Sequence, residues 1–450
     1  MSDHNQANDG VNHRAIFWIC VLALFSAAMS FSLRTGVSGA IKQSLFDPVN
    51  PLHSGEMIAA AIGNSFLGFA ISLLIVSPLL DVLGAKRVIL TASLCYIVGP
   101  LLIIFAPQAG APGAVYQMIM LGMIVCGIAW GCSEGSINPV TTALYPNDKT
   151  KRLNALHAWW PAGIVTGGLA SIVLFKQLAL GWQAGIALIM IPGAAFGLWA
   201  VTQKFPKMES TTLGVPFGEM MLEPLKRPTF WIFPAIMFLT ASAELAPGSW
   251  VDVALSQTVG MPGILVLVYV SAIMFIGRHF AGFFEHRISD MGLLCVCTVP
   301  AAAGLYLLSF ANSPPTALVA ATLWAIGVCF MWPTMIAAVS RRYRRGGPWV
   351  IGITGFAGAM AIYYVLPEIG KIYDQAKLEA AGGDAAFNAL VPGPELTRVL
   401  AFAAEKSFQF VAAIPVILFF IFGAVWLIER GLKRKLGDKD SDVASQSVGA

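Results

Sequence analysis

Twelve apolar segments, each about 20 residues long, follow one another along this chain. A helix needs about 20 such residues to cross the hydrocarbon core of a bilayer, whereas the strands of a membrane barrel alternate in polarity over about 10 residues. Every backbone N–H and C=O group in hydrocarbon must also be bonded within the structure. Charged residues make up 12 % of the chain, about half the share that a soluble surface needs. The sequence therefore predicts an all-α polytopic membrane protein.

The apolar segments also predict how the chain is divided. We place the spans at residues 15–38, 57–80, 88–106, 114–138, 155–178, 183–203, 229–253, 263–285, 291–311, 315–338, 349–369 and 407–429. A polar loop at 204–228 separates a six-helix half at 1–203 from a second half at 229–450, which ends in a polar tail. We expect a further connection, over 373–406, to be a loop with room for a short helix, and we assign it no function. The prediction is twelve transmembrane helices in two six-helix halves.

The distribution of Lys and Arg predicts the orientation, because cytoplasmic loops retain these residues. If both termini are cytoplasmic, that side carries 20 of the 28 Lys and Arg residues and the opposite side carries six. The remaining two lie within spans. We expect both termini in the cytoplasm and the protein in a bacterial inner membrane. The seven cysteines all fall within apolar segments, which indicates packing residues rather than disulfides.

The loop after the second span carries a recognisable motif. Residues 77–87 read Ser-Pro-Leu-Leu-Asp-Val-Leu-Gly-Ala-Lys-Arg, which resembles the signature loop Gly-x-x-x-Asp-x-x-Gly-x-Lys/Arg-Lys/Arg of the major facilitator superfamily. Ser77 replaces the usual first glycine, and residues 282–287 look like a degenerate second copy. The resemblance implies the major facilitator fold. It also implies a conformational latch made of Asp81, Gly84, Lys86 and Arg87.

A second motif spans the fourth and fifth segments. Residues 132–139 read Cys-Ser-Glu-Gly-Ser-Ile-Asn-Pro, and 153–157 read Leu-Asn-Ala-Leu-His. This arrangement resembles the fucose–proton symporter family, and the resemblance implies that Glu134 takes part in proton-coupled sugar binding. That family has an acid in the first span where this chain has Arg34. Coupling to protons through Glu134 alone, coupling to Na⁺, and uncoupled diffusion therefore all stay open.

Five ionisable residues lie deep within spans, where a charge needs a partner, a cavity or a proton. They are Arg34, Glu134, Glu244, Asp252 and Arg278. Arg34 would either pair with Glu134 or bind an anionic substrate. Arg278 would face Glu244 across the second half, as a structural pair or as a ligand site.

Other residues are candidates for the wall of a central cavity. Asn64 and Asn138 are polar at depth, and His157, Trp160 and Trp332 combine aromatic faces with hydrogen-bonding groups, which suits a sugar ring. Trp159 is more typical of an interface anchor. We also expect the Pro247-Gly248 pair to break the seventh span and open backbone groups towards the cavity.

These features predict a secondary transporter that moves a sugar or similar hydroxylated metabolite, with H⁺ as its coupling ion. An organic-anion or carboxylate transporter is the alternative within this class, and a non-transporting membrane sensor is the alternative outside it. No catalytic or metal-binding motif is present, so we expect no enzyme activity, no metal and no cofactor. The expected partners are the small-molecule substrate and the bilayer, not nucleic acid, and we expect a monomer.

Overall fold

The structure is a computed structural model that describes the chain except residues 1–9, 146–151, 153–154, 207–215, 280–288 and 449–450. Within the described residues every regular element is helical. In this part of the chain eleven helices are long and apolar enough to cross a membrane, and the shorter apolar helix Ile264–Arg278 lies where the eighth span is predicted. The chain is an integral membrane protein with the predicted all-α architecture.

The first half contains α1 (His13–Ile41), α2 (Ser54–Leu83), α3 (Ala85–Phe105), α4 (Pro112–Leu144), α6 (Trp159–Ile172), α7 (Trp182–Leu188) and α8 (Met190–Val201). Short π-helices, Lys42–Phe46 and Val173–Gln177, extend α1 and α6, and α7 with α8 forms one span. Amphipathic helix α10 (Phe217–Lys226) lies in the central loop. It packs on the start of the eleventh span.

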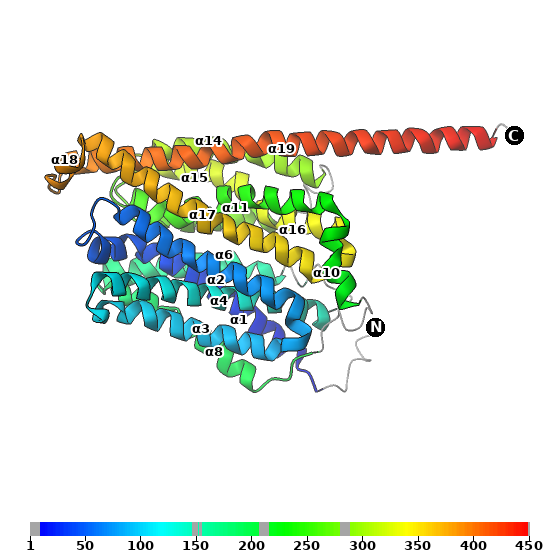
Figure 1. Cartoon of the computed structure of the whole chain (residues 1–450), viewed down its shortest axis with the longest axis horizontal. Helices are drawn as coiled ribbons and strands as arrows, with labels where there is room; N and C mark the ends of the chain where they lie inside the picture. The colour runs from blue at the N-terminus through cyan, green and yellow to red at the C-terminus, as the bar shows by residue number, and fades with distance from the viewer. Residues whose placement is uncertain (1–9, 146–151, 153–154, 207–215, 280–288, 449–450) are drawn as a thin grey trace.

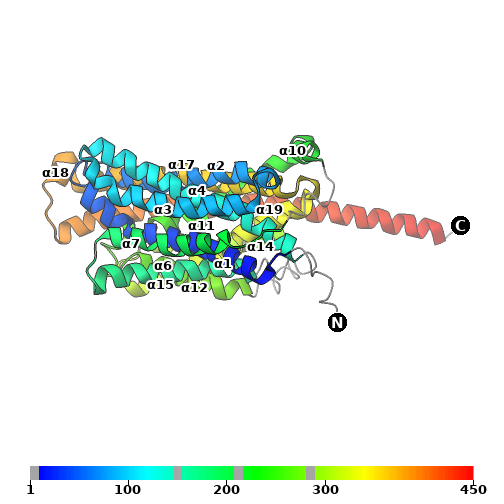
Figure 2. The ribbon, with the colours of Figure 1, turned by 90° about the horizontal axis from the view of Figure 1, so that it is seen from below.

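The second half contains α11 (Ile232–Leu255), α12 (Ile264–His279), α14 (Asp290–Ser309), α15 (Pro314–Val328), α16 (Met331–Arg342), α17 (Gly347–Ala381), α18 (Asp384–Asn388) and α19 (Pro394–Val448). Helix α1 begins and helix α19 ends at the same end of the bundle, which we call the terminal end (Figures 1 and 2). The opposite end, which carries α18, is called the far end.

The two halves meet along α2 and α17, which lie side by side over most of their length (Figure 1). Glycines allow this close approach. A Cβ atom at Gly370 would lie 2.7 Å from the carbonyl oxygen of Gly55, and one at Gly352 would lie 2.9 Å from the Ser77 hydroxyl. Further contacts between the halves join α1 to α11 and α6 to α12.

Two expectations about helix continuity are wrong. The expected loop at 373–406 is largely helical, because α17 continues to Ala381 and α19 already begins at Pro394. Good helix formers over 374–381 carry α17 beyond its apolar part. The helix ends at Gly382, whose φ of +86° favours glycine.

Helix α11 is also continuous through Pro247, where we expected a break. Proline lacks an N–H group, so the carbonyl four residues earlier, on Ala243, loses its helical donor. The indole Nε1–H of Trp324, on α15, donates to that carbonyl at 3.2 Å. A side chain from another span thus satisfies the freed group, and the helix need not open. The break falls instead in the tenth span, between α15 and α16.

Candidate functional site

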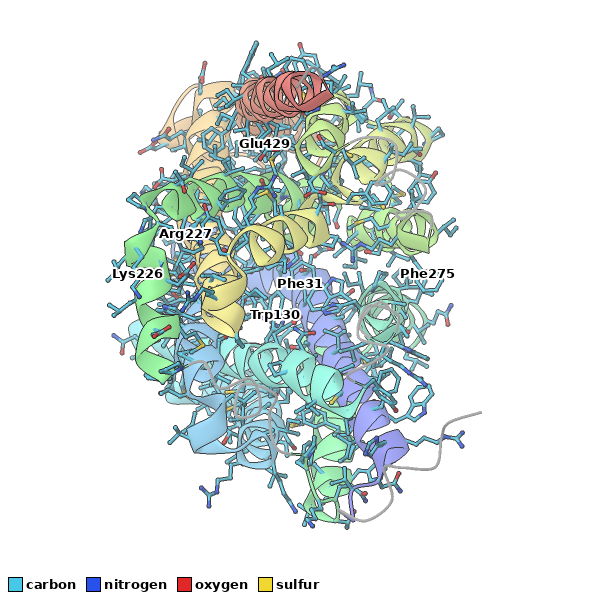
Figure 3. All side chains as sticks on the ribbon, turned by 90° about the vertical axis from the view of Figure 1, so that its right-hand side faces the viewer. Phe31, Trp130, Lys226, Arg227, Phe275 and Glu429 are labelled. Atoms are coloured by element: carbon cyan, nitrogen blue, oxygen red, sulfur yellow. The ribbon has the colours of Figure 1, made fainter. Side chains whose placement is uncertain are left out.

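An aromatic stack lies in the interior of the first half. The ring of Trp130, on α4, stacks on Phe69 of α2 with centroids 4.3 Å apart and on Trp160 of α6 with centroids 5.0 Å apart. Phe31 and Phe66 pack at an angle to the Trp130 ring, with centroids 6.2 Å and 5.4 Å from that of Trp130. Figure 3 shows Phe31 and Trp130 near the middle of the molecule, viewed from the terminal end. Four spans therefore build one apolar wall that ends at the half-buried Trp160.

A polar chain lies beside this wall, one turn further along α4. Glu134 follows Trp130 by four residues, so both side chains lie on one face of the helix. The Asn138 amide Nδ2 donates to Glu134 Oε2 at 3.4 Å, and Asn138 Oδ1 lies 2.8 Å from His157 Nε2. All three polar side chains are half-buried. The Glu–Asn–His chain joins α4 to the segment before α6, and it places a carboxyl group next to the aromatic stack.

The second half has its own buried charge pair. Arg278 Nη2 lies 3.4 Å from Glu244 Oε1. The two residues therefore form an ion pair, one of the two arrangements that the sequence allowed. The side chain of Glu244 is 6 % exposed and that of Arg278 is 23 % exposed. Arg278 Nε donates to the carbonyl of Cys329 at 3.1 Å, and the Trp332 backbone N–H donates to Glu244 Oε2 at 3.2 Å.

Pro333 explains this arrangement. A proline at 333 cannot donate to the carbonyl of Cys329, four residues before it. Arg278 supplies the missing donor from α12, and Glu244 accepts a freed N–H group on the other side of the break from α11. The pair therefore holds the discontinuity of the tenth span together. Pro333 itself is exposed.

The two polar groups lie on neighbouring helices of the two halves. Helices α6 and α12 pack against each other. His157 lies just before α6 begins, and Arg278 lies in the last turn of α12. The Glu–Asn–His chain and the Arg278–Glu244 pair are therefore held by helices that meet across the interface of the two halves.

Three residues that the sequence nominated, Arg34, Asn64 and Trp332, do not contact the aromatic stack or the Glu–Asn–His chain in any interaction among the described residues. Arg34 is 2 % exposed between α1 and α4, where Nε donates to the Ser30 carbonyl and Nη1 lies 4.0 Å from Met123 Sδ. Within the described residues no ion pair joins it to Glu134 or to another carboxylate. Asn64 is also buried within the first half, where its amide donates to the sulfur of Met120 at 3.4 Å.

Trp332 is half-buried on α16, and its indole packs over α17. A Cβ atom at Gly358 would lie 2.7 Å from the Trp332 ring. Trp159 does not belong to the aromatic stack. It is 38 % exposed and packs edge-on against Trp18 with centroids 5.7 Å apart. Its role as an interface anchor stays a prediction.

The loop after α2 shows what its basic residues contact. Gly84 has a φ of +80°, a conformation that favours glycine and allows the tight turn from α2 to α3. Lys86 Nζ donates to the carbonyls of Val201 at 2.7 Å and Gln203 at 3.0 Å, at the end of α8. Arg87 is exposed. The side chain of Asp81 and the possible second copy at 282–287 lie outside the described residues.

Comparisons with known proteins agree with this architecture. The family model of the Major Facilitator Superfamily matches residues 19–366, about three quarters of the chain. The chain belongs to the major facilitator superfamily. No curated protein sequence matches it.

Several solved major facilitators share the fold. A D-xylose–proton symporter has 13 % identity and a TM-score of 0.70, with 89 % of this chain and 97 % of that one covered. The nucleoside transporter NupG, as a mutant, has 15 % identity and a TM-score of 0.64, covering 91 % and 99 %. A mutant of the Escherichia coli fucose–proton symporter FucP has 18 % identity and a TM-score of 0.56, covering 90 % and 98 %. At these identities the likeness shows the fold alone.

Of the residues in the aromatic stack, only Trp160 was predicted from the sequence. Trp130 lies one helical turn before Glu134, and this spacing was the signal that could have nominated it. Phe31, Phe66 and Phe69 gave no such signal, because single aromatic residues in apolar spans are ordinary packing residues. Only the packing of α1, α2 and α4 shows that they meet at Trp130.

Proposed function

We propose that this major facilitator carries a sugar or a similar small hydroxylated metabolite, and that Glu134 couples its movement to protons. The observation that carries the proposal is the aromatic stack ending at Trp160, with the Glu134–Asn138–His157 chain beside it. A sugar ring offers apolar C–H faces to an aromatic surface and hydroxyl groups to a carboxyl, amide or imidazole. A carboxyl group held in an apolar interior is suited to bind and release a proton as water gains and loses access to it.

The proposed cycle is alternating access, in which the half at 1–203 rocks against the half at 229–450 about the loop 204–228. The excess of Lys and Arg in the loops at the terminal end supports a cytoplasmic position for both termini. We further propose that the protein acts as a monomer, because one chain contains both halves that alternating access requires, and that it resides in a bacterial inner membrane.

Transport by purified protein in liposomes tests this function. An imposed inward proton gradient should drive uphill uptake of at least one labelled compound from a panel of neutral sugars and nucleosides. A pH-sensitive dye inside the liposomes should report acidification of the interior during this uptake. Glu134→Gln should reduce gradient-driven uptake at least about tenfold yet leave counterflow exchange measurable, because Gln cannot carry the coupled proton but can still hydrogen-bond a sugar hydroxyl group. The control Glu395→Gln changes an exposed carboxylate that pairs with Arg398, and it should leave both activities unchanged.

The outcomes separate the alternatives. Uptake driven by Na⁺ instead of protons, or equal coupling in Glu134→Gln, would refute the proton role while keeping the carrier. No substrate-dependent flux across the panel, with ligand-induced thermal stabilisation still present, would favour the membrane sensor and refute transport.

A carboxylate or other organic anion is the second candidate cargo. Arg278 favours it, because its side chain remains 23 % exposed although it pairs with Glu244. Arg34 remains the other candidate cation. If the cargo is anionic, Arg278→Met or Arg34→Ala should weaken binding of carboxylates far more than binding of neutral sugars. An equal loss of affinity for carboxylates and for neutral sugars would exclude the hypothesis of an anionic cargo.

A further inference from the structure

Two carboxylates of the second half bind backbone amides of the first half at the far end. The first is Asp374, on α17, which is 3 % exposed. Its Oδ1 accepts a hydrogen bond from Gly55 N at 3.2 Å, and its Oδ2 accepts one from Glu56 N at 2.7 Å. These amides belong to the first turn of α2, where N–H groups have no helical acceptor and a negative charge is favoured. Asp374 thus caps a helix of the opposite half.

Lys377 strengthens the same contact one turn further along α17. Its Nζ forms an ion pair with Asp374 and also donates to the carbonyl of Pro51 at 2.8 Å. The side chains of Lys377 and Asp374 are 1 % and 4 % exposed. A buried ion pair is tolerated when further hydrogen bonds satisfy its members. Here those further bonds all go to the backbone before and within the start of α2.

The second carboxylate is Asp252, at the end of α11, which is 8 % exposed. Its Oδ2 accepts a hydrogen bond from Gly39 N of α1 at 3.1 Å, and its Oδ1 accepts one from the Ser256 hydroxyl at 2.9 Å. The Ser256 hydroxyl oxygen in turn accepts a hydrogen bond from the Gly263 backbone N–H at 2.8 Å. Asp252 therefore joins the last turns of α1 to the loop that follows α11.

Each contact includes a glycine amide as a donor, and each uses the space that the missing Cβ leaves. A Cβ atom at Gly55 would lie 2.6 Å from Asp374 Oδ1, and one at Gly39 would lie 2.8 Å from Asp252 Oδ2. Any larger residue would push the carboxylate away. The two contacts are thus built alike, with an acid of the second half on a glycine amide of the first.

We propose that Asp374, Lys377 and Asp252 are positioning residues that hold the far end closed in the conformation seen here, and that alternation must release them from α1 and α2. The closed state satisfies these buried charges with main-chain groups of the opposite half, whereas water would have to solvate them once the halves part. The proposal does not depend on the cargo or on the coupling ion.

The distance between two spin labels across the far end tests the proposal without any substrate. Val49 precedes α2 and Val391 lies between α18 and α19, and they are 51 % and 73 % exposed. Labels on Val49→Cys and Val391→Cys would report on opening in the full chain reconstituted in lipid nanodiscs. The native cysteines are buried or half-buried, and the chain without added cysteines gives the background.

We expect Asp374→Ala to raise the ratio of far-open to far-closed molecules by about tenfold, as loss of charge-assisted hydrogen bonds implies. Gly55→Ala and Gly39→Ala should shift the same distribution, since they displace a carboxylate without removing any charge. The matched control is Glu395→Gln. It breaks the Glu395–Arg398 ion pair of 2.6 Å at the start of α19, but both residues lie within the second half, so the distribution should stay that of the parent.

If Asp374→Ala does not fold, Asp374→Asn and Gly39→Ala decide the outcome. Asn keeps one oxygen acceptor and should open the far end to a smaller extent than Ala would. Distributions of Asp374→Asn and Gly39→Ala identical to that of the parent would overturn the proposal. Opening of equal size in Glu395→Gln would also overturn it, because a general weakening of that end would then explain the effect.

Discussion

In the tenth span, a side chain of α12 replaces the hydrogen-bond donor that Pro333 lacks, and the energetic effect of this replacement can be predicted. In the structure Arg278 Nε donates to the carbonyl of Cys329, the group that Pro333 leaves without a helical donor. Arg278→Met should remove that bond while keeping an apolar stem of similar length. To avoid leaving a buried carboxylate unpaired, the substitution is made together with Glu244→Gln.

The cost follows from the group that is left unsatisfied. A buried carbonyl without a donor costs about 1–3 kcal/mol. Adding Pro333→Ala restores an N–H group at position 333, which can donate to Cys329 in the regular helical pattern. We therefore expect Arg278→Met to lower the free energy of unfolding by about 1–3 kcal/mol in the Glu244→Gln chain, and by about 0.5 kcal/mol or less once Pro333→Ala is present.

Unfolding in mixed micelles with increasing denaturing detergent, followed by tryptophan fluorescence, measures these differences. The double-mutant cycle between positions 278 and 333 isolates their coupling. As a control, Arg430→Met alters a half-exposed α19 side chain near Trp426, and its effect should add to that of Pro333→Ala without coupling. If the loss caused by Arg278→Met is the same with proline and with alanine at 333, Arg278 does not replace the missing donor.

Two further predictions concern packing and capping in the first half. A Cβ atom at Gly127 of α4 would overlap the Ser65 carbonyl of α2, so Gly127→Ala should lower the free energy of unfolding by about 1–3 kcal/mol and lower the midpoint of thermal unfolding. As a control, a Cβ atom at Gly113 on the same helix meets nothing within 4 Å, so Gly113→Ala should be neutral. Equal effects of the two substitutions would contradict the close approach of α4 to α2. Lys86→Met should speed amide hydrogen exchange in the last turn of α8, because the carbonyl of Val201 loses its donor; unchanged exchange there would show that Lys86 does not cap this helix.

Much of the fold could be predicted from the sequence, because a bilayer imposes strict rules on apolar segments. The length of each segment predicts its span, and the polar central loop predicts two halves. Prolines were harder to interpret. Pro247 and Pro333 both lie within apolar spans, yet α11 is continuous and the tenth span is broken. The difference depends on which side chains of neighbouring helices reach the freed carbonyls, and those contacts are not local in the sequence.

The candidate site shows the same division. Glu134 and Asn138 are four residues apart on one helix, so their proximity follows from helical geometry. His157 was nominated from the motif at 153–157, and it lies beside Asn138 in the structure. The sequence could not say whether Arg34 pairs with Glu134. Both lie deep within their spans, but their side chains leave the helices in directions that only the packing of α1 against α4 defines, and no ion pair forms.

The sequence by itself determined that this protein is an all-helical membrane protein with major facilitator signatures and ionisable residues at depth. Apolar length, loop charge and short motifs are local properties, and hydrocarbon tolerates few structures that satisfy them. Only the tertiary structure decided which of these charges meet. The Glu244–Arg278 pair around the broken span and the Asp374 cap on α2 each join segments far apart in the chain. A buried charge is stabilised by whatever surrounds it in space, and that environment exists only after the helices have packed.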